Sequence, residues 1–373
     1  MVELEKVLVI GGGIGGMSAA IALAQAGYAV ELIEQDPNWG VLGAGLTVLG
    51  STLRALGHLG VLDEVMQEGY FAYGNNIYSY KGNLLTTRPG MAMPDVDLPG
   101  GGGILRPTLH KILAAAIKRE GVVVRLGVTY NQLTQSADHV HVNFTDGSSG
   151  RYGLVVAAEG LVSKLRGMLF PNAAQPKFTG QGCWRLVTDR PDEIDKSSFY
   201  VGGPVTVGTV PVSQSQMYVW ILEHVPGNPW VDPETQHLKL AELLKDFGGV
   251  VGQLRDELGP DSTIVYRPLE AVLQPAPWYN GRVLLLGDSA HATTPHLASG
   301  AGIGVEDGVV LAQELLRANS IEQALEAHMQ RRFERCRLVV ESSIEIGDVE
   351  MAGESHRIND LMNVAQDALS QPF

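Results

Sequence analysis

The feature that most constrains this chain is a glycine-rich turn near its N-terminus, Gly11–Gly16 (GGGIGG). It follows the short apolar run Lys6–Ile10 and leads into the small-residue stretch Met17–Ala26, after which Tyr28–Ile33 is again apolar. Apolar runs of this length are typical of strands buried on both faces of a parallel sheet. The order predicts a strand, a tight turn, a helix and a second strand, which is a right-handed βαβ unit.

The glycine spacing indicates what this unit binds. Gly11 permits the tight turn, Gly13 lets the backbone approach a pyrophosphate, and Gly16 allows close packing of helix on strand. The helix N-terminus then faces the negative charge of the ligand. Glu34 ends the second strand, where a carboxylate accepts hydrogen bonds from a ribose. The sequence predicts dinucleotide binding, with a purely structural glycine turn as the alternative; the motif alone does not separate FAD from NAD.

The charge balance argues against some partners. With 27 Lys and Arg against 41 Asp and Glu, the net charge is −14. Such a chain has no general attraction for nucleic acid or for an anionic membrane. One basic cluster is present, Arg331, Arg332, Arg335 and Arg337, and we interpret it as the solvated face of a late helix.

The cysteines and the hydrophobic runs indicate a cytoplasmic protein. Cys183 and Cys336 lack CxxC or metal-ligand spacing, so we expect free thiols in a reducing compartment and no metal site. The apolar stretch Val7–Ile33 is interrupted by glycines, and no other run reaches the roughly 18 apolar residues of a membrane span. We therefore expect no signal peptide and no stable membrane association.

The 373 residues suffice for two to three domains at roughly 150 residues each. Alternating polarity in Cys183–Thr188, Val205–Val212 and Gln216–Leu222 predicts an antiparallel sheet. The stretch Met91–Gly103 has two prolines and ends in four glycines, which indicates a loop. Further strands are expected at Asn76–Tyr80, Val122–Leu126, Val140–Phe144, Leu154–Ala158 and Arg282–Leu286, and helices at Ser51–Leu56, Val61–Gln67, Arg106–Lys118, Thr235–Phe247, Gly304–Arg317 and Ile321–Val340.

Two later motifs carry a family resemblance. The first is Ala158-Glu-Gly-x-x-Ser-x-x-Arg166, and the second is Gly287-Asp-Ser-Ala-His-x-x-x-Pro295, continued by Ser299–Asp307. With Gly43–Leu46 and Arg106, these motifs resemble those of the class A flavoprotein aromatic hydroxylases, the family of salicylate, para-hydroxybenzoate and urate hydroxylases. The resemblance runs from residue 6 to about residue 340, with the motifs in the family's order.

The resemblance implies an α/β fold in which a Rossmann-like FAD-binding domain carries an inserted, mainly antiparallel β-sheet substrate domain and a C-terminal helical segment. The FAD-binding domain would comprise residues 1–72, 104–178 and 279–340. The substrate domain would comprise residues 73–103 and 179–278. The tail, 341–373, would be mostly helical and would cover the flavin domain or form a contact in a possible homodimer.

The resemblance also implies FAD as the cofactor. Asp288 would accept a hydrogen bond from the ribityl chain, and Arg106 would place a cation near the phosphates or ribityl. The helix that starts near Gly302 would direct its positive end at the flavin's pyrimidine oxygen or the pyrophosphate. For Asp288 a cap and for Arg106 an ion pair are the alternatives. The expected cofactor residues are Gly11, Gly13, Ile14, Gly15, Gly16, Glu34, Gln35, Ala44, Gly45, Arg106, Val128, Glu159, Asp288, Pro295, Gly300, Ala301 and Gly302.

Glu159 departs from the family pattern, which usually has Asp at this place. The extra methylene displaces the carboxylate, so either the site tolerates Glu or the handling of cofactor or NAD(P)H is altered. Ser163 and Arg166 are retained. His291 and His296 are interpreted as packing or supporting residues rather than as acid or base.

The chemistry implied is hydroxylation of a small phenolic or N-heteroaromatic substrate. In this family NADH or NADPH reduces FAD, which reacts with O₂ to give the C4a-hydroperoxyflavin that transfers one oxygen to an electron-rich ring. A reductase or oxidase of the same fold without oxygen insertion is the second candidate, and a ligand-sensing flavoprotein the third. The Trp-x-Trp-x-Ile-Pro signature of flavin halogenases is absent; Tyr218–Leu222 is the nearest match and fails.

The substrate residues should project from the antiparallel sheet over the flavin. Tyr218 and His224 are the candidates for activating a phenol, although neither is a convincing general base. Arg185 is a candidate for holding a carboxylate, and Trp220 for contacting the substrate. Core packing is the alternative for Trp220, because aromatic side chains bury large areas in such sheets.

Overall fold

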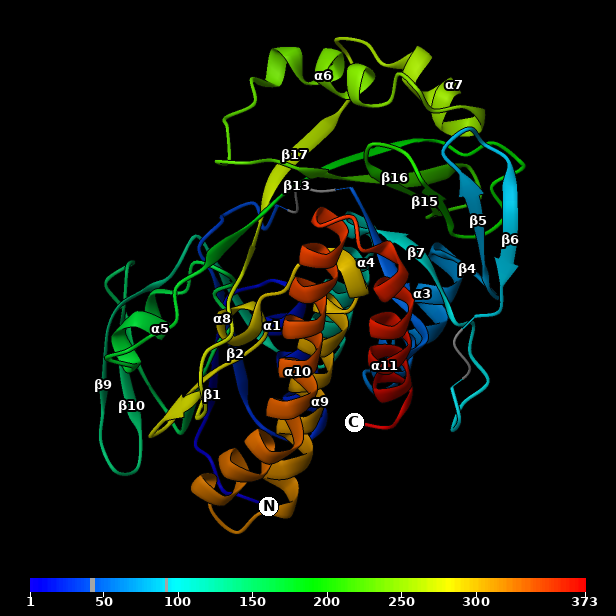
Figure 1. Ribbon diagram of the computed structural model, residues 1–373. Helices are drawn as coiled ribbons and strands as arrows, with labels where there is room; N and C mark the ends of the chain where they lie inside the picture. Colours follow the sequence, from blue (N-terminus) through cyan, green and yellow to red (C-terminus); the bar gives the residue numbers. More distant parts are fainter. Residues whose placement is uncertain (41–43, 91–92) are drawn as a thin grey trace.

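The computed structural model describes residues 1–40, 44–90 and 93–373, so Gly43 and the start of Met91–Gly103 lie outside the described residues. A six-stranded sheet has the order β18-β19-β12-β1-β2-β8 (Figure 1). β1 (Val7–Ile10) is parallel to both its neighbours, β2 (Val30–Glu34) and β12 (Leu154–Ala157). The expected βαβ unit is confirmed, with α1 spanning Ile14–Gln25. The other strands are β8 (Val123–Leu126), β18 (Tyr279–Asn280) and β19 (Val283–Leu285).

Helices pack against this sheet and form the main core. Glycine at position 308 lets α9 (Gly300–Arg317) lie against α1, because a Cβ at this position would come within 2.6 Å of the Ala19 backbone. α10 (Ile321–Met351) packs beside α9. The remaining helices near the sheet are α2 (Gly50–His58), α3 (Leu62–Glu68), α4 (Arg106–Arg119), α5 (Lys164–Leu169) and the short α8 (Asp288–His291).

A seven-stranded, mainly antiparallel sheet forms the second layer, in the order β17-β13-β16-β15-β14-β5-β6. In chain order its strands are β5 (Asn75–Ser79), β6 (Leu84–Arg88), β13 (Lys177–Asp189), β14 (Ser198–Val201), β15 (Thr206–Pro211), β16 (Gln216–His224) and β17 (Ile264–Ala271). Helices α6 (Gln236–Leu243) and α7 (Gly249–Glu257) cover its outer face (Figure 1). Side chains such as Trp184 and Ile221 pack beneath them. Because strand side chains alternate, the neighbours of these residues face the parallel sheet.

The helix expected at Thr235–Phe247 is present as α6, but it ends four residues earlier than expected and a second helix follows it. The chain leaves the helical path after Leu243, buries Phe247, and starts α7 at Gly249 with a φ of +60°. Periodicity alone does not mark this break, because apolar residues continue through it.

The expected loop Met91–Gly103 was predicted to extend too far at its C-terminal end. Gly101–Leu105 is strand β7, which pairs with β3 (Gly45–Leu49) and β4 (Tyr70–Ala72). Glycine in a strand generally weakens the strand. Here the neighbouring chain leaves no room for a side chain, since a Cβ at Gly103 would lie 2.7 Å from the Pro211 carbonyl oxygen. Another small sheet contains β9 (Tyr130–Gln135), β10 (Val140–Phe144) and β11 (Ser149–Tyr152).

The C-terminal boundary also differs from expectation. The helix expected to end near Val340 continues to Met351 as α10. A final helix, α11 (Ile358–Ser370), then runs beside α10 (Figure 1). Apolar side chains such as Ile346 and Val349 keep the end of α10 buried, which explains why it does not stop earlier.

The solvated face expected for the basic cluster of α10 is present at Arg337, whose side chain is 43% exposed, but not at Arg332 and Arg335. The Arg332 side chain is 0% exposed and bonds Glu306 and Asp307 of α9 at 2.7 Å each. Arg335 bonds Glu306 and donates to the carbonyls of Ala368 and Leu369. Arg332 and Arg335 therefore join α10 to α9 through buried ion pairs, and Arg335 joins it to α11 through hydrogen bonds. Both cysteines are free and buried, and no helix in the described ranges has the length and hydrophobicity of a membrane span.

Candidate active site

A cavity of about 2190 Å³ lies between the carboxyl ends of the parallel strands and the inner face of the seven-stranded sheet. Ligands of open α/β sheets bind at this edge. Its wall contains these expected cofactor residues: Gly11, Gly13, Ile14, Gly15, Gly16, Glu34, Gln35, Ala44, Gly45, Arg106, Glu159, Asp288, Pro295, Gly300 and Ala301. Two expected residues are not in the wall. Val128 packs into the main core, and Gly302 faces α2, where a Cβ would lie 2.2 Å from Thr52 Oγ1.

The glycine turn has the backbone geometry that a pyrophosphate needs. Gly11 has a φ of +105°, and a Cβ there would lie 2.2 Å from the Ala158 carbonyl oxygen. A Cβ at Gly16 would lie 2.0 Å from the Gly11 carbonyl oxygen, whereas one at Gly13 would meet nothing within 4 Å. The N-terminus of α1 has no side-chain cap, so its free N–H groups can bind an anion. Glu34 orders the turn by accepting from Gly12 N at 2.7 Å.

The other end of the cavity has the groups expected around a flavin. Asp288 follows β19 and lies deep in the protein with its carboxylate open to the cavity. Burial raises its pKa, because desolvation disfavours the charged form. Arg106 also lines the cavity. The N-terminus of α9 lacks a side-chain cap and has Gly300 and Ala301 at the wall. A carboxylate, a cation and an uncapped helix N-terminus together fit FAD.

Glu159 lies in the wall, but its carboxylate is occupied by protein donors. It accepts hydrogen bonds from Tyr130 Oη at 2.8 Å, Ser163 Oγ at 2.7 Å and Leu165 N at 2.9 Å. The last two bonds hold the first turn of α5. The longer Glu side chain is thus used to brace the turn that follows β12.

A buried ionic cluster supports the Asp288 turn from behind. His291 Nε2 lies 2.6 Å from Asp307 Oδ2, and the same oxygen accepts from Gly287 N at 3.1 Å. Burial alone would lower the pKa of His291, but its interactions with Cys336 and Asp307 raise it well above its usual value. His291 is not in the cavity wall, in agreement with the expected packing role.

The strand register places the expected substrate residues on one face. Arg185 lies opposite Trp220, and Tyr218 and His224 follow on the same face of β16. All four line the cavity. Gly208 makes room for the Trp220 ring, since a Cβ there would lie 2.2 Å from it.

The four residues are not equally placed to act on a ring. Burial raises the pKa of Tyr218 strongly, so its hydroxyl stays protonated and can only donate or accept a neutral hydrogen bond. His224 is exposed at the end of β16. Arg185 lies beside the Cys183 thiol and the Tyr218 hydroxyl. Of the four residues, Arg185 and Trp220 are therefore the best placed to contact a ring in the cavity.

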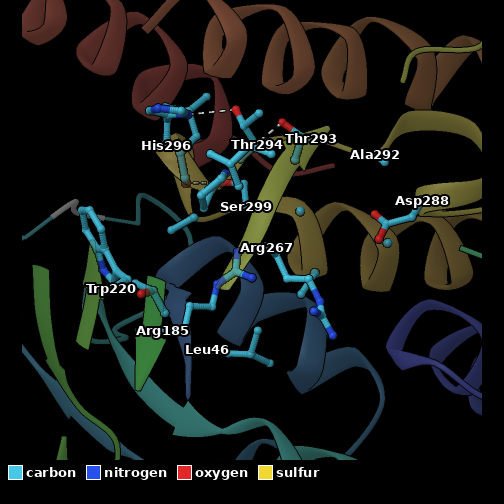
Figure 2. Close-up of a pocket in the computed structure, with 18 of the residues that line it drawn as sticks. Leu46, Arg185, Trp220, Arg267, Asp288, Ala292, Thr293, Thr294, His296 and Ser299 are labelled. Carbon is cyan, nitrogen blue, oxygen red and sulfur yellow. Dashed lines mark hydrogen bonds between the residues drawn. The ribbon is translucent and has the colours of Figure 1, made fainter. Parts of the chain in front are cut away.

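Two further residues of the site were not expected from the sequence. Arg267 of β17 pairs with Cys183, two residues from Arg185 along β13, so it lies on the same face as Arg185 and lines the cavity. Figure 2 shows Arg185 and Arg267 extending into the space between Trp220 and Asp288. The strand alternation of Ile264–Ala271 could have indicated Arg267. Glu350 was missed because α10 was expected to end ten residues earlier.

Glu350 belongs to a polar cluster at the end of α10. It accepts from Gln181 Nε2 at 3.0 Å and from Thr206 Oγ1, and it lies 3.6 Å from His296 Nε2. His296 Nδ1 in turn lies 2.9 Å from Thr294 Oγ1 (Figure 2). The cluster connects α10 and the substrate sheet to the motif that follows Asp288.

Comparison with known proteins agrees with this geometry. The family model described as "FAD binding domain" matches residues 5–344. The 2-heptyl-3-hydroxy-4(1H)-quinolone synthase of Pseudomonas aeruginosa is 31% identical over 331 residues, covering 87% of this chain and 84% of that protein. The FAD-dependent urate hydroxylase of Klebsiella pneumoniae is 28% identical over 349 residues, covering 90% and 88%.

A solved structure shows the same fold. The Klebsiella pneumoniae HpxO complex with FAD and uric acid superposes with a TM-score of 0.88 at 25% identity, covering 98% of this chain and 97% of that one. The α/β class expected from the sequence, with a Rossmann-like domain, an antiparallel sheet and C-terminal helices, is confirmed. The chain belongs to the FAD-binding family of flavin-dependent monooxygenases, with the class A aromatic hydroxylases as its structural relatives.

Proposed function

We propose that this protein uses NADH or NADPH and O₂ to hydroxylate an acidic aromatic or N-heteroaromatic ring. The observation that carries the proposal is the pair Arg185 and Arg267 on the cavity face of the substrate sheet. In the described part of the chain neither has a carboxylate partner; Arg267 donates only to the Tyr266 carbonyl. The half-buried Arg185 and the neighbouring exposed Arg267 favour an anionic ligand, because an anion pairs with both guanidinium groups and offsets the desolvation of Arg185.

An anionic ring is also the chemically suitable substrate. Deprotonation of a ring hydroxyl or lactam makes the ring carbons more nucleophilic, and FAD, when bound, supplies the redox and oxygen-activating chemistry. The protein's own residues would bind and orient the ring: Arg185 and Arg267 hold the anion, Trp220 contacts its face, and the Tyr218 hydroxyl donates a hydrogen bond. The relatives named for urate and for a hydroxyquinolone act on N-heteroaromatic compounds, which supports this class.

The expected cofactor roles belong to the same proposal. The α1 N-terminus would bind the pyrophosphate, Glu34 the adenosine ribose, and Asp288 the ribityl chain, with Arg106 adding a cation. We place the FAD-binding domain at residues 1–72, 104–178 and 279–340 and the substrate domain at 73–103 and 179–278. A homodimer stays a prediction, testable by light scattering. Reduction or oxidation without oxygen insertion is the alternative function.

The arginine pair gives a direct test. Uric acid, as the probe, is titrated into the FAD-loaded protein while the flavin absorbance is followed. We expect Arg185→Met and Arg267→Met each to weaken binding about tenfold or more, as for a lost charged hydrogen bond, with FAD content unchanged. Arg151→Met, at an exposed arginine, is the matched control. Equal affinity for uric acid in the wild type and in all three variants would contradict the proposal.

A further inference from the structure

Gly12, in the middle of the glycine turn, is held through both its backbone polar groups by side chains from outside the turn. Its N–H donates to Glu34 Oε2 at 2.7 Å, and its carbonyl oxygen accepts from the indole Nε1 of Trp39 at 2.9 Å. Gly12 does not line the cavity, whereas Gly11 and Gly13 on either side of it do. The two hydrogen bonds therefore leave the cavity side of the turn to a ligand.

The hydrogen bond from Trp39 fixes the direction of the next N–H group along the chain. A peptide bond is planar and trans, so the carbonyl oxygen of Gly12 and the N–H of Gly13 point in opposite directions. Because the oxygen points at Trp39, the Gly13 N–H points away from the indole, and Gly13 lines the cavity. This N–H has no acceptor in the described part of the chain. It is therefore available to an anion at the N-terminus of α1.

The peptide between Gly12 and Gly13 has little steric resistance of its own to turning over. Both flanking residues are glycine, which adopts many backbone conformations at low steric cost. A Cβ at Gly13 would meet nothing within 4 Å. Rotation by half a turn would direct the Gly12 carbonyl oxygen, instead of an N–H, at a bound phosphate, and the negative end of that dipole repels an anion. The hydrogen bond from Trp39 opposes this rotation.

Trp39 is itself held in place, at a conformational cost. Its φ is +46°, a left-handed value that residues other than glycine rarely adopt. Asp36 stabilises the turn that contains it by accepting from Asn38 N at 2.9 Å and from Gly40 N at 2.8 Å. The indole meets the His110 ring edge to face, with the ring centroids 5.1 Å apart. Strained backbone of this kind is concentrated at functional sites, where the surrounding structure maintains it.

We propose that Trp39 is a positioning residue for the FAD pyrophosphate: by holding the Gly12 carbonyl, it directs the Gly13 N–H at the phosphates. The inference rests on the proposed binding of the pyrophosphate at the N-terminus of α1. Trp39 does not line the cavity, so it acts through the backbone of the turn and not by contact with the cofactor. A role in packing alone would need only the aromatic ring, whereas this role needs the indole N–H.

The experiment removes the indole N–H and keeps an aromatic ring. Full-length Trp39→Phe apoprotein is titrated with FAD, and the quenching of flavin fluorescence gives the dissociation constant. We expect binding about fivefold weaker than in the wild type, as for one lost hydrogen bond. In the phosphorus NMR spectrum of the FAD-saturated protein, the two pyrophosphate resonances should shift from their wild-type positions, because a donor to the phosphates is no longer directed at them. Trp230→Phe, at a residue that is 77% exposed, is the matched control and should change neither readout.

A second variant disturbs the same contact from the side of the turn. A Cβ at Gly12 would lie 2.3 Å from Trp39 Nε1, so Gly12→Ala should displace the indole from the carbonyl oxygen. We expect Gly12→Ala to weaken FAD binding and to shift the pyrophosphate resonances in the same direction as Trp39→Phe. This variant keeps the proposal testable if Trp39→Phe does not fold.

The outcomes separate this inference from the proposed cofactor roles. Wild-type FAD affinity in Trp39→Phe and Gly12→Ala overturns the inference and leaves those roles intact. Weaker binding with unshifted pyrophosphate resonances also overturns it, because packing alone would then account for the loss. If the wild-type apoprotein binds no FAD, the proposed cofactor roles fail together with the inference.

Discussion

The Asp307 carboxylate lies between His291 and Arg332 in the interior, 2.6 Å from His291 Nε2 and 2.7 Å from Arg332 Nε. All three side chains are 0% exposed. Because the same carboxylate accepts from Gly287 N at 3.1 Å, it joins α9 and α10 to the turn that presents Asp288. The cofactor end of the cavity is thus held by an ionic cluster whose three residues do not line the cavity.

Removing the charge of Asp307 should destabilise the protein. In Asp307→Asn, His291 and Arg332 lose their anion, and breaking a buried ion pair costs about 3–5 kcal/mol. Urea unfolding of the apoprotein measures this cost. Asp348→Asn, at an exposed residue of α10, is the control and should change stability by less than about 0.5 kcal/mol.

The loss of stability in Asp307→Asn should depend on pH in a direction that the pKa shifts of Asp307 and His291 define. The ion pairs lower the pKa of Asp307, so its contribution is present above its unfolded value near 4 and is lost as the pH falls through the folded value. The pKa of His291 is raised, so its contribution is complete below about 6.5 and is lost as the pH rises through the folded value. The difference between wild type and Asp307→Asn should be largest between about pH 4 and 6.5. A difference that grows steadily toward pH 9 would contradict the assignment.

Asp288 should contribute directly to FAD retention. Asp288→Ala removes a carboxylate that faces the cavity, and the loss of a charge-assisted hydrogen bond of about 1.5–3 kcal/mol weakens binding roughly 10- to 100-fold. Titration of apoprotein with FAD, followed by quenching of flavin fluorescence, measures the constant. Asp261→Ala, at an exposed turn, serves as the control. Wild-type FAD affinity in Asp288→Ala would count against the motif assignment.

Glu159→Asp should affect stability more than cofactor binding. The shorter side chain cannot keep all its bonds to Tyr130, Ser163 and Leu165, and each lost bond costs about 1 kcal/mol. Tyr130→Phe removes one of these bonds without moving the carboxylate and should show a smaller decrease. Thermal unfolding compares the two variants, and FAD titration should give similar constants for both. A melting temperature of Glu159→Asp equal to wild type would show that the family's usual Asp fits here equally well.

Glu350 should stabilise the junction of α10 and the substrate sheet in a pH-dependent way. Burial alone would raise its pKa, but the bonds from His296, Thr206 and Gln181 lower it overall. Its contribution is therefore present above the unfolded value near 4.3 and is lost as the pH falls through the folded value. Glu350→Gln should cost about 1–3 kcal/mol at pH 7 and less at pH 4. Glu326→Gln, exposed on the same helix, should show no such dependence; a pH-independent cost for Glu350→Gln would refute the charge-based account.

The cofactor half could be predicted because local sequence determines its geometry. Gly11 needs glycine for its φ of +105° and Gly16 for its contact with the Gly11 carbonyl, and Asp288 lies three residues after the end of a buried strand. Alternation in Cys183–Thr188 and Gln216–Leu222 predicted the antiparallel strands that carry Arg185 and Trp220, whereas the register that pairs these two residues is seen only in the structure.

The parts that escaped prediction depend on distant contacts. Gly101–Gly103 forms a strand only because β3 and β4 flank it closely. The helical pattern of the sequence predicts a solvated Arg332. Its burial follows only from Glu306 and Asp307 of the neighbouring helix, which pair with it. Glu350 entered the site only because α10 extends past Val340, where tertiary packing overrides local signals.

The central claim is tested most directly by NAD(P)H oxidation with product masses. FAD-loaded protein is mixed with NADH or NADPH and O₂ across hydroxybenzoates, hydroxypyridines, purines and alkylated hydroxyquinolines. The account predicts that an acidic N-heteroaromatic compound accelerates oxidation and gains one oxygen atom, and that Arg185→Met removes both effects while keeping FAD. Acceleration without oxygen gain for every compound, or no acceleration by any of them, would contradict it and favour the reductase or oxidase alternative.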